Sequence, residues 1–250
     1  MIKMCRMLLA SGNVDMGFLL DGLISMALDQ NEIHERNEEG GLGSWQHAGG
    51  WGIAYLKDGK WITHKSTKPV FEDSSTELFR NIKTNLVVMH ARFATVGTVC
   101  LENTHPFLIK DNKEFGDVVF CHNGTIRGDI PYNQEKYTPQ GVTDSERLFF
   151  SLLTDFSINP DFPDAIKKNM AKHQNTAGVN VILSSPKISF ISIKENDAPL
   201  YYCMKISRKD GMTVISSEKI PRLEPSAYLD QGEIAILKGN ELEIIPRQDL

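Results

Sequence analysis

The chain has 250 residues, 41% of them hydrophobic, and a formal net charge of -5. An acidic chain argues against a general nucleic-acid surface, which normally carries a basic patch. Its apolar runs fall short of the roughly 20 residues that cross a bilayer and of the ~7–15 that form the core of a secretory signal. We therefore expect a cytoplasmic protein that binds neither nucleic acid nor membrane.

The first third of the chain contains short periodic segments and one irregular stretch. Residues 5–11 have the apolar pattern of a strand, and residues 15–30 have that of an amphipathic helix. Residues 31–50 are charged and contain five glycines, which predicts a loop. The dipeptide Asp58-Gly59 favours a tight hairpin turn. The two runs that would pair across this turn are 51–57 and 61–65.

The rest of the chain alternates between blocks of helices and blocks of strands. Helices are expected near 75–83, at 143–156 and at 161–172. Apolar strands are expected at 86–93, 118–121, 179–183, 188–193, 200–206, 213–217, 234–237 and 242–245. The strand at 118–121 would place His122-Asn123-Gly124 at its end. Strict βαβ alternation is missing, which favours an α+β fold over a doubly wound sheet. No linker interrupts the pattern after residue 50, so we expect one domain over residues 5–250.

Cys5 lies almost at the start of the chain, where it can use a base that no interior cysteine has. If Met1 to Met4 are absent from the mature protein, the thiol and a free α-amine share one Cα. The thiol titrates near ~8.5 and the amine near ~7.7–8.0, so the amine can accept the thiol proton and return it to a departing amine. We expect residues 1–4 to be a removed leader or to lie upstream of the true start at Met4. Standing alone, Cys5 would be read as an inert cysteine in an edge strand.

Cys5 belongs to a series of six short motifs that follow one another along residues 4–146. They are Met4-Cys5, Gly50-Trp51-Gly52, His90-x-Arg92-x-x-Thr95-x-Gly97, Asn103-x-His105-Pro106-Phe107, His122-Asn123-Gly124 and Thr143-Asp144-Ser145-Glu146. In this order the motifs resemble the class II glutamine amidotransferases, which are N-terminal-nucleophile hydrolases. The likeness is greatest to their compact stand-alone branch of γ-glutamyl amidohydrolases. The resemblance implies a four-layer αββα sandwich within the α+β class.

The resemblance assigns the chemistry at the scissile amide to Cys5, Asn123 and Gly124. Cys5 would attack the γ-carbonyl carbon and form a thioester. The side-chain N–H of Asn123 and the backbone N–H of Gly124 would form the oxyanion hole, in which the loss of one donor typically lowers the rate by ~10²–10³. Read without the resemblance, Asn-Gly is the favoured sequence of a tight hairpin turn.

The resemblance also assigns residues to the glutamyl head. Arg92 would grip the α-carboxylate through its planar fork, and Asp144 the α-ammonium, while Thr95 and Val96 would line the pocket. The alternative for Arg92 is a structural ion pair. The alternative for Asp144 is helix capping, because Thr143 and Glu146 have the spacing of a capping box. Many synthase-linked members carry histidine where this chain has Val96, so free glutamine is not favoured over other γ-glutamyl compounds. His90, His105 and Trp51 are expected to be scaffold.

The expected activity is hydrolysis of the γ-amide of glutamine or of a γ-glutamyl compound, with no cofactor and no metal. About a hundred residues follow the motifs, too few for a synthase domain in addition to the rest of the fold. Two alternatives therefore stay open: a glutaminase subunit that passes ammonia to a separate synthase chain, and a non-catalytic sensor of γ-glutamyl ligands. A homo-oligomer is also left open. A zinc site would draw on Cys5, His90, His105, Cys121 and His122, whose spacing lacks the short paired intervals of zinc motifs.

Overall fold

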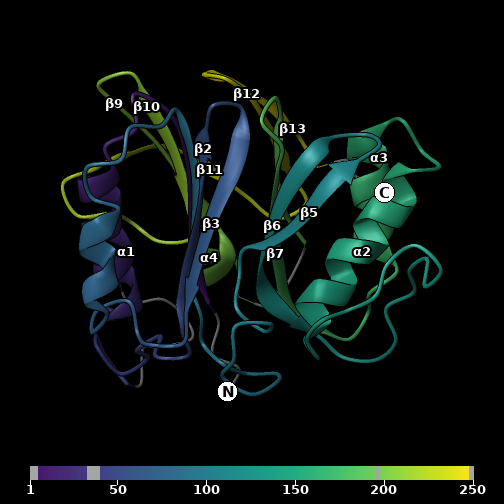
Figure 1. The fold of residues 1–250 in the computed structure, drawn as a ribbon, viewed down its shortest axis with the longest axis horizontal. Helices are drawn as coiled ribbons and strands as arrows, with labels where there is room; N and C mark the ends of the chain where they lie inside the picture. Colours follow the sequence, from purple (N-terminus) through teal and green to yellow (C-terminus); the bar gives the residue numbers. More distant parts are fainter. Residues whose placement is uncertain (1–4, 33–39, 195–197, 248–250) are drawn as a thin grey trace.

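Two antiparallel sheets packed face to face form the centre of the molecule (Figure 1). The computed structural model describes residues 5–32, 40–194 and 198–247. The first sheet has seven strands in the order β11-β9-β10-β1-β4-β2-β3. These strands are β1 (Arg6–Gly12), β2 (Trp51–Lys57), β3 (Lys60–Ser66), β4 (Leu86–Ala91), β9 (Met204–Lys209), β10 (Met212–Ser216) and β11 (Pro225–Leu229).

The second sheet has six strands in the order β13-β12-β8-β7-β6-β5. These strands are β5 (Phe107–Asn112), β6 (Gly116–Ile126), β7 (Thr176–Ser184), β8 (Ser189–Ile193), β12 (Ile234–Lys238) and β13 (Glu241–Ile245). Segments from the first part of the sequence (β1 to β4) and from its last part (β9 to β11) therefore meet in the first sheet, and β1 lies in the middle of that sheet.

The strands next to the centre are apolar on both faces because both faces are covered. In β1, Met7 and Leu9 belong to the core between the sheets, whereas Leu8 and Ala10 pack against α1 (Met16–Ala27). This follows from the alternation of side chains along a strand. Met7 and Leu9 of β1 therefore face the second sheet, and Cys5 lies immediately before this strand.

Two helices cover the outer face of the second sheet (Figure 1). They are α2 (Asp144–Phe156) and α3 (Phe162–Ala171). Phe120 of β6 stacks on Phe149 of α2, with 4.9 Å between ring centroids. The order of layers is thus α1, first sheet, second sheet, α2 with α3. The predicted α+β fold with four αββα layers is confirmed.

Several predicted elements differ in the structure. The strands β5 and β11 were not anticipated. The helix expected near 75–83 is the short 3-10 helix η1 (Ser74–Leu78). The strand expected at 200–206 begins as a helix, α4 (Pro199–Tyr202), because Pro199 stands in its first turn, a position that suits proline's fixed φ. No helix within the described ranges is long and apolar enough to cross a membrane.

The motif His122-Asn123-Gly124 lies inside β6 and not at the end of a strand. Asn123 pairs with Asn180 and Gly124 with Val179 of β7, so the ladder continues through the motif. Both the predicted strand end and the alternative of a hairpin turn at Asn-Gly are wrong. The turn prediction at Asp58-Gly59 is confirmed, since β2 pairs with β3 around it and both turn residues have positive φ, 51° and 75°.

Candidate active site

Most of the residues expected to act together line one small cavity beside the start of β1. Its volume is about 20 Å³, room for about one water molecule. We call it the Cys5 cavity; it is lined by Cys5, Arg92, Phe93, Thr95, Val96, Asn103, His105, His122, Gly124, Thr143, Asp144 and Ser145. Six of the seven expected site residues are among them, and Asn123 is not. The sheets, the loop after β4 and the start of α2 thus bring the motifs together.

Cys5 lies immediately before β1, with its thiol against the backbone of Phe93. The Phe93 N–H donates to Sγ at 3.4 Å, and Sγ lies 3.6 Å from the Phe93 carbonyl oxygen. Burial raises the pKa of the thiol to about 11, although the Phe93 amide and the Arg92 guanidinium act in the opposite direction. With a chain continuing before Cys5, the thiol is therefore protonated at neutral pH and needs a base to become a nucleophile.

Asn123 lies on β6 with its side chain in the space between the sheets. Cys121 and Val119, two and four positions earlier on the same face, belong to the core between the sheets. Asn123 is 0% exposed, and neither its Nδ2 nor its Oδ1 has a hydrogen-bond partner in the described part of the chain. An amide group buried without a partner is uncommon in folded proteins. Both Nδ2 and Oδ1 of Asn123 therefore have unused hydrogen-bonding capacity.

Gly124 is glycine for a packing reason as well as for the chemistry expected of it. A Cβ added there would lie 2.2 Å from the carbonyl oxygen of Gly178 and 2.4 Å from Nε2 of His122. Neither distance can be tolerated without a shift of the backbone or of a buried ring. Gly124 therefore packs tightly against β7 and His122, and it also lines the Cys5 cavity.

Arg92 follows β4 and holds the loop that closes the Cys5 cavity. Its guanidinium donates to the carbonyl oxygens of Val96 (2.8 Å), Gly97 (3.3 Å) and Thr98 (3.1 Å). Its partners in the described residues are carbonyl groups, so the structural ion pair considered above is not what the structure shows. A guanidinium has five N–H groups, and three carbonyl groups of this loop share those of Arg92.

Asp144 is the first residue of α2 and also fixes the end of β6. Its Oδ2 accepts a hydrogen bond from the Ile126 N–H at 2.7 Å. Thr143 caps the helix by accepting from the Glu146 N–H at 3.3 Å. The other half of the expected capping box is absent among the described residues, since Glu146 accepts from the amides of Gln140 and Gly141 instead. Asp144 therefore sits rigidly in the first turn, where the helix dipole favours a carboxylate.

The histidines of the motifs connect the layers around the cavity. His90 Nε2 lies 3.3 Å from the carbonyl oxygen of His122, and the rings of His90 and His105 are 4.2 Å apart. His122 Nδ1 lies 3.0 Å from Ser145 Oγ in α2. Burial lowers the pKa of His90 to about 3 and that of His122 to about 4, so both are neutral at physiological pH. Within the described ranges, no three His, Cys, Asp or Glu residues are grouped to hold a metal ion.

Three polar residues near the site were missed or undervalued in the sequence. Asn103 joins two loops, because its Nδ2 donates to the Thr98 carbonyl (3.1 Å) and its Oδ1 accepts from the Val142 N–H (2.9 Å). Thr125 Oγ1 lies 3.3 Å from Thr95 Oγ1. Asn180 lies opposite Asn123. The signal that could have revealed Asn180 is its position as a lone polar residue in an apolar strand.

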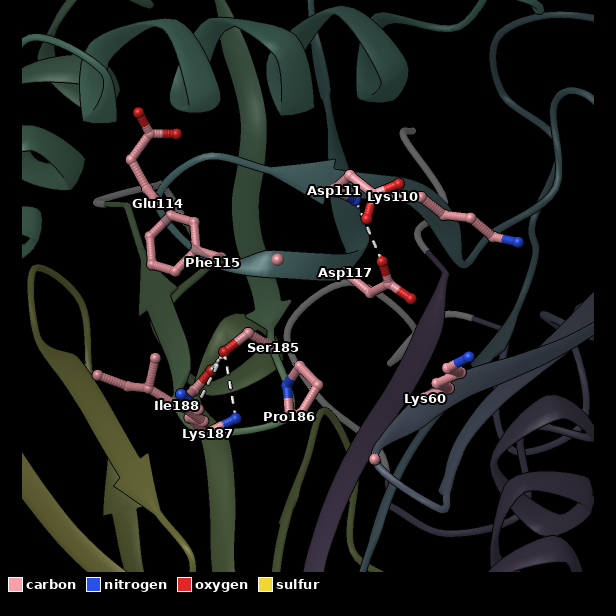
Figure 2. A pocket seen from close by; sticks show the side chains of 12 residues that line it. Lys60, Lys110, Asp111, Glu114, Phe115, Asp117, Ser185, Pro186, Lys187 and Ile188 are labelled. Carbon is pink, nitrogen blue, oxygen red and sulfur yellow. Dashed lines mark hydrogen bonds between the residues drawn. The ribbon is translucent and has the colours of Figure 1, made fainter.

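A larger depression lies among three hairpin turns, away from the Cys5 cavity (Figure 2). Its volume is about 670 Å³, and we call it the lysine depression after Lys60, Lys110 and Lys187, which line it with Asp111, Glu114 and Asp117. Figure 2 shows two sets of hydrogen bonds within its turns, from the Asp111 N–H to Asp117 Oδ1 at 3.1 Å and from the Ile188 N–H to Ser185 Oγ at 3.2 Å. The depression contains no expected site residue.

Comparison with known proteins gives relatives of one kind. The family model for class-II glutamine amidotransferases matches residues 16–184, a range that begins after Cys5. The protein YafJ of Escherichia coli (strain K12) is 34% identical over 155 residues, which are 60% of this chain and 54% of YafJ. The amidophosphoribosyltransferase of Methanocaldococcus jannaschii is 26% identical over 220 residues, which are 81% of this chain and 44% of that protein. The chain thus spans about half the length of these relatives.

Solved structures show the same fold at low sequence identity. The glutamine phosphoribosylpyrophosphate amidotransferase of Bacillus subtilis superposes with a TM-score of 0.71 and 15% identity, over 96% of this chain and 48% of that one. A glutamine aminotransferase class-II domain protein from Silicibacter pomeroyi gives a TM-score of 0.63 and 16% identity, over 98% of this chain and 100% of that one. By the family match over more than half of its length, the chain belongs to the class-II glutamine amidotransferases.

Proposed function

We propose that the chain hydrolyses the γ-amide of glutamine or of a γ-glutamyl compound through a thioester on Cys5. The observation that carries the proposal is the Cys5 cavity itself, in which the thiol meets Gly124, Arg92 and Asp144. A nucleophile, an amide donor, a cation and an anion are the groups that an α-amino acid with a reactive side-chain amide requires.

The first half of the reaction forms the thioester. The free α-amine of Cys5 takes the thiol proton, and Sγ bonds to the γ-carbonyl carbon while the carbonyl oxygen becomes an oxyanion. Asn123 Nδ2 and the Gly124 N–H donate to this oxygen. The carbon–nitrogen bond then breaks, and the departing amine or ammonia takes the proton from the α-ammonium. Water attacks the thioester in the second half and restores the thiol with release of glutamate.

The raised pKa of Cys5 supports the proposal that residues 1–4 are absent from the active chain. Its pKa of about 11 applies to a cysteine whose nitrogen is part of a peptide bond. The nearby His122 has a pKa lowered to about 4 and is a poor base for such a thiol. A terminal amine on the same residue would supply the missing base.

Recognition of the glutamyl head by Arg92 and Asp144 requires the cavity to open. Its volume of about 20 Å³ accommodates about one water and not an amino acid. The carbonyl groups of Val96 and Gly97 occupy the Arg92 guanidinium. We propose that the substrate carboxylate replaces them as the loop after β4 moves outward.

The fate of the nitrogen separates hydrolysis from synthase coupling. Relatives of this chain include an amidophosphoribosyltransferase and a glutamine–fructose-6-phosphate aminotransferase by name, which favours ammonia delivery to a separate chain as the second candidate. A sensor is the third candidate, and the protonated thiol of a chain that retains residues 1–4 favours it.

The experiment compares two forms of the protein, one that begins at Cys5 and one that keeps residues 1–4. Release of glutamate from glutamine and from a series of γ-glutamyl amides is measured for both. We expect turnover from the first form and at most a trace from the second. Equal turnover by the two forms would remove the α-amine from the mechanism. Binding without turnover by both would favour the sensor.

A further inference from the structure

Asn180 is a buried polar residue on β7, directly opposite Asn123 of β6. It is 0% exposed, and its neighbours along the strand are Val179, Val181 and Ile182. A primary amide in such an apolar strand calls for an explanation, because buried polar groups are normally hydrogen-bonded. Its bond to Tyr202 uses only the nitrogen of this amide, which leaves the oxygen to be explained.

The side chains of Asn180 and Asn123 lie on the same face of the second sheet. Ile182 and Cys121, two residues along each strand, both belong to the core between the sheets. Residues directly opposite each other in an antiparallel pair have Cβ atoms about 4.5–5.5 Å apart. The two side chains are therefore neighbours across the ladder. They are not bonded to each other in the described structure, and a rotation of the Asn123 side chain is the change that would bring its Nδ2 to Asn180 Oδ1.

A hydrogen bond to α4 sets the orientation of the Asn180 amide. Its Nδ2 donates to the carbonyl oxygen of Tyr202 at 2.6 Å, at the end of α4. The ring of Tyr202 packs against Gly178, where an added Cβ would lie 2.0 Å from it. Because the nitrogen is turned to this carbonyl, Oδ1 is turned away from it, and Oδ1 has no partner among the described residues.

We propose that Asn180 is a positioning residue for the oxyanion hole: its Oδ1 accepts one hydrogen of Asn123 Nδ2 and leaves the other for the oxyanion. The inference rests on the proposed function. It pairs two buried groups that otherwise lack partners, Asn180 Oδ1 and Asn123 Nδ2. It also selects one of the two orientations of the Asn123 amide. In the flipped orientation two carbonyl oxygens would face each other.

A purely structural role is the competing explanation, in which Asn180 only fastens β7 to α4 through Tyr202. The two explanations differ in what the variant Asn180→Ala disturbs. If Asn180 only joins β7 to α4, its loss should lower the stability of the fold and change the reactivity of Cys5 as well as kcat. Loss of positioning would lower kcat through Asn123 and leave KM and the Cys5 thiol unchanged.

The test uses the form that begins at Cys5 and three variants: Asn180→Ala, Asn123→Ala and the double variant. Ser184→Ala is the matched control, because Ser184 is equally buried on the same face of β7 and its hydroxyl bonds only to Ser189 at 2.6 Å. We expect Asn180→Ala to lower kcat for glutamate release about tenfold, the factor of about 1.4 kcal/mol expected from one hydrogen bond. In the Asn123→Ala background the same change should have no further effect. Alkylation of Cys5 by iodoacetamide, a displacement that forms no oxyanion, should proceed at the wild-type rate.

Two results would overturn the inference. One is a fall in the kcat of the double variant equal to the product of the falls in the two single variants, and the other is an unchanged kcat in Asn180→Ala. A parallel fall in kcat and in alkylation rate would assign Asn180 to structure. A second readout does not depend on turnover: the side-chain amide resonance of Asn123, identified by its loss in Asn123→Ala, should shift in Asn180→Ala and not in Ser184→Ala. If the wild-type chain hydrolyses nothing, the proposed function fails, and this resonance still decides whether the two amides are coupled.

Discussion

The Cys5 cavity and the lysine depression are opposites in what usually draws attention to a binding site. The lysine depression is the larger, at about 670 Å³ against about 20 Å³, and several of its groups bond within the turns that carry them. Among the described residues that line it, Glu114 has one buried oxygen, Oε2, without a partner. The Cys5 cavity is nearly closed, but three buried nitrogens of its lining have no partner in the described part of the chain: Nδ1 and Nε2 of His105 and Nε2 of His122. Unsatisfied buried donors and acceptors, more than volume, indicate where a polar substrate is expected.

The strongest way to break this comparison is to remove the thiol. Cys5→Ala should leave the fold intact and abolish glutamate release, because no other nucleophile faces the scissile carbon in the proposed mechanism. Cys203→Ala serves as the control, since Cys203 is buried outside the Cys5 cavity, and Lys110→Ala probes the lysine depression. Steady-state kinetics on purified variants should show full activity for both controls. Activity lost in Lys110→Ala and kept in Cys5→Ala would reverse our choice of site.

The next largest effect is expected at the oxyanion hole. Asn123→Ala should lower kcat by about 10²–10³ with little change in KM, the usual result of losing one preorganised donor. Asn169→Ala is a matched control, because Asn169 is also 0% exposed but lies on α3, bonded to Ser151 Oγ at 2.9 Å. The control should lose stability in thermal unfolding while kcat stays the same. A small effect of Asn123→Ala would leave Gly124 as the sole donor.

Arg92→Ala is expected to act on substrate binding. Loss of the fork that meets the carboxylate should raise KM by about 10–100-fold and alter kcat less. The exposed Arg127, whose guanidinium bonds to Asn175 Oδ1 at 3.2 Å, supplies the control variant Arg127→Ala. If KM is unchanged and the melting temperature falls instead, Arg92 serves only to hold the loop at Val96 to Thr98.

The pH dependence of alkylation concerns the thiol itself and not turnover, and it sharpens the picture of the Cys5 site. Burial raises the pKa of Cys5 to about 11 when residues 1–4 are present. The thiolate is the reactive form, so the iodoacetamide rate in that form should rise about tenfold per unit between about pH 7 and about pH 10. Mass mapping of the Cys5 peptide, with Cys5→Ala to account for other thiols, measures it. A rate that levels off near neutral pH would reveal a base already present beside the thiol.

The sequence was sufficient for the layers of the fold and for the composition of the site. Motifs such as Thr143-Asp144 and the dipeptide Asp58-Gly59 act through local geometry, and local geometry is what a sequence encodes most directly. The cap at Thr143 and the hairpin turn were therefore found where they were expected.

Features that depend on pairing between distant strands could not be predicted in the same way. Asn123 and Gly124 resemble a turn, but their pairing with β7 keeps them extended, and only the register places Asn180 beside Asn123. The contact of Gly124 with Gly178 arises from that register too. Arg92 binds loop carbonyls because the loop folds over it, an arrangement that its motif spacing does not specify.

The most direct test of the central claim is to trap the glutamyl–enzyme intermediate. The form that begins at Cys5 is mixed with a γ-glutamyl substrate, quenched in acid within the first turnover and digested for mass spectrometry. We expect the N-terminal peptide to carry one glutamyl group on Cys5 that hydroxylamine removes, as a thioester requires. Full turnover with an unmodified Cys5 peptide, or with the glutamyl group on another residue, would contradict the account.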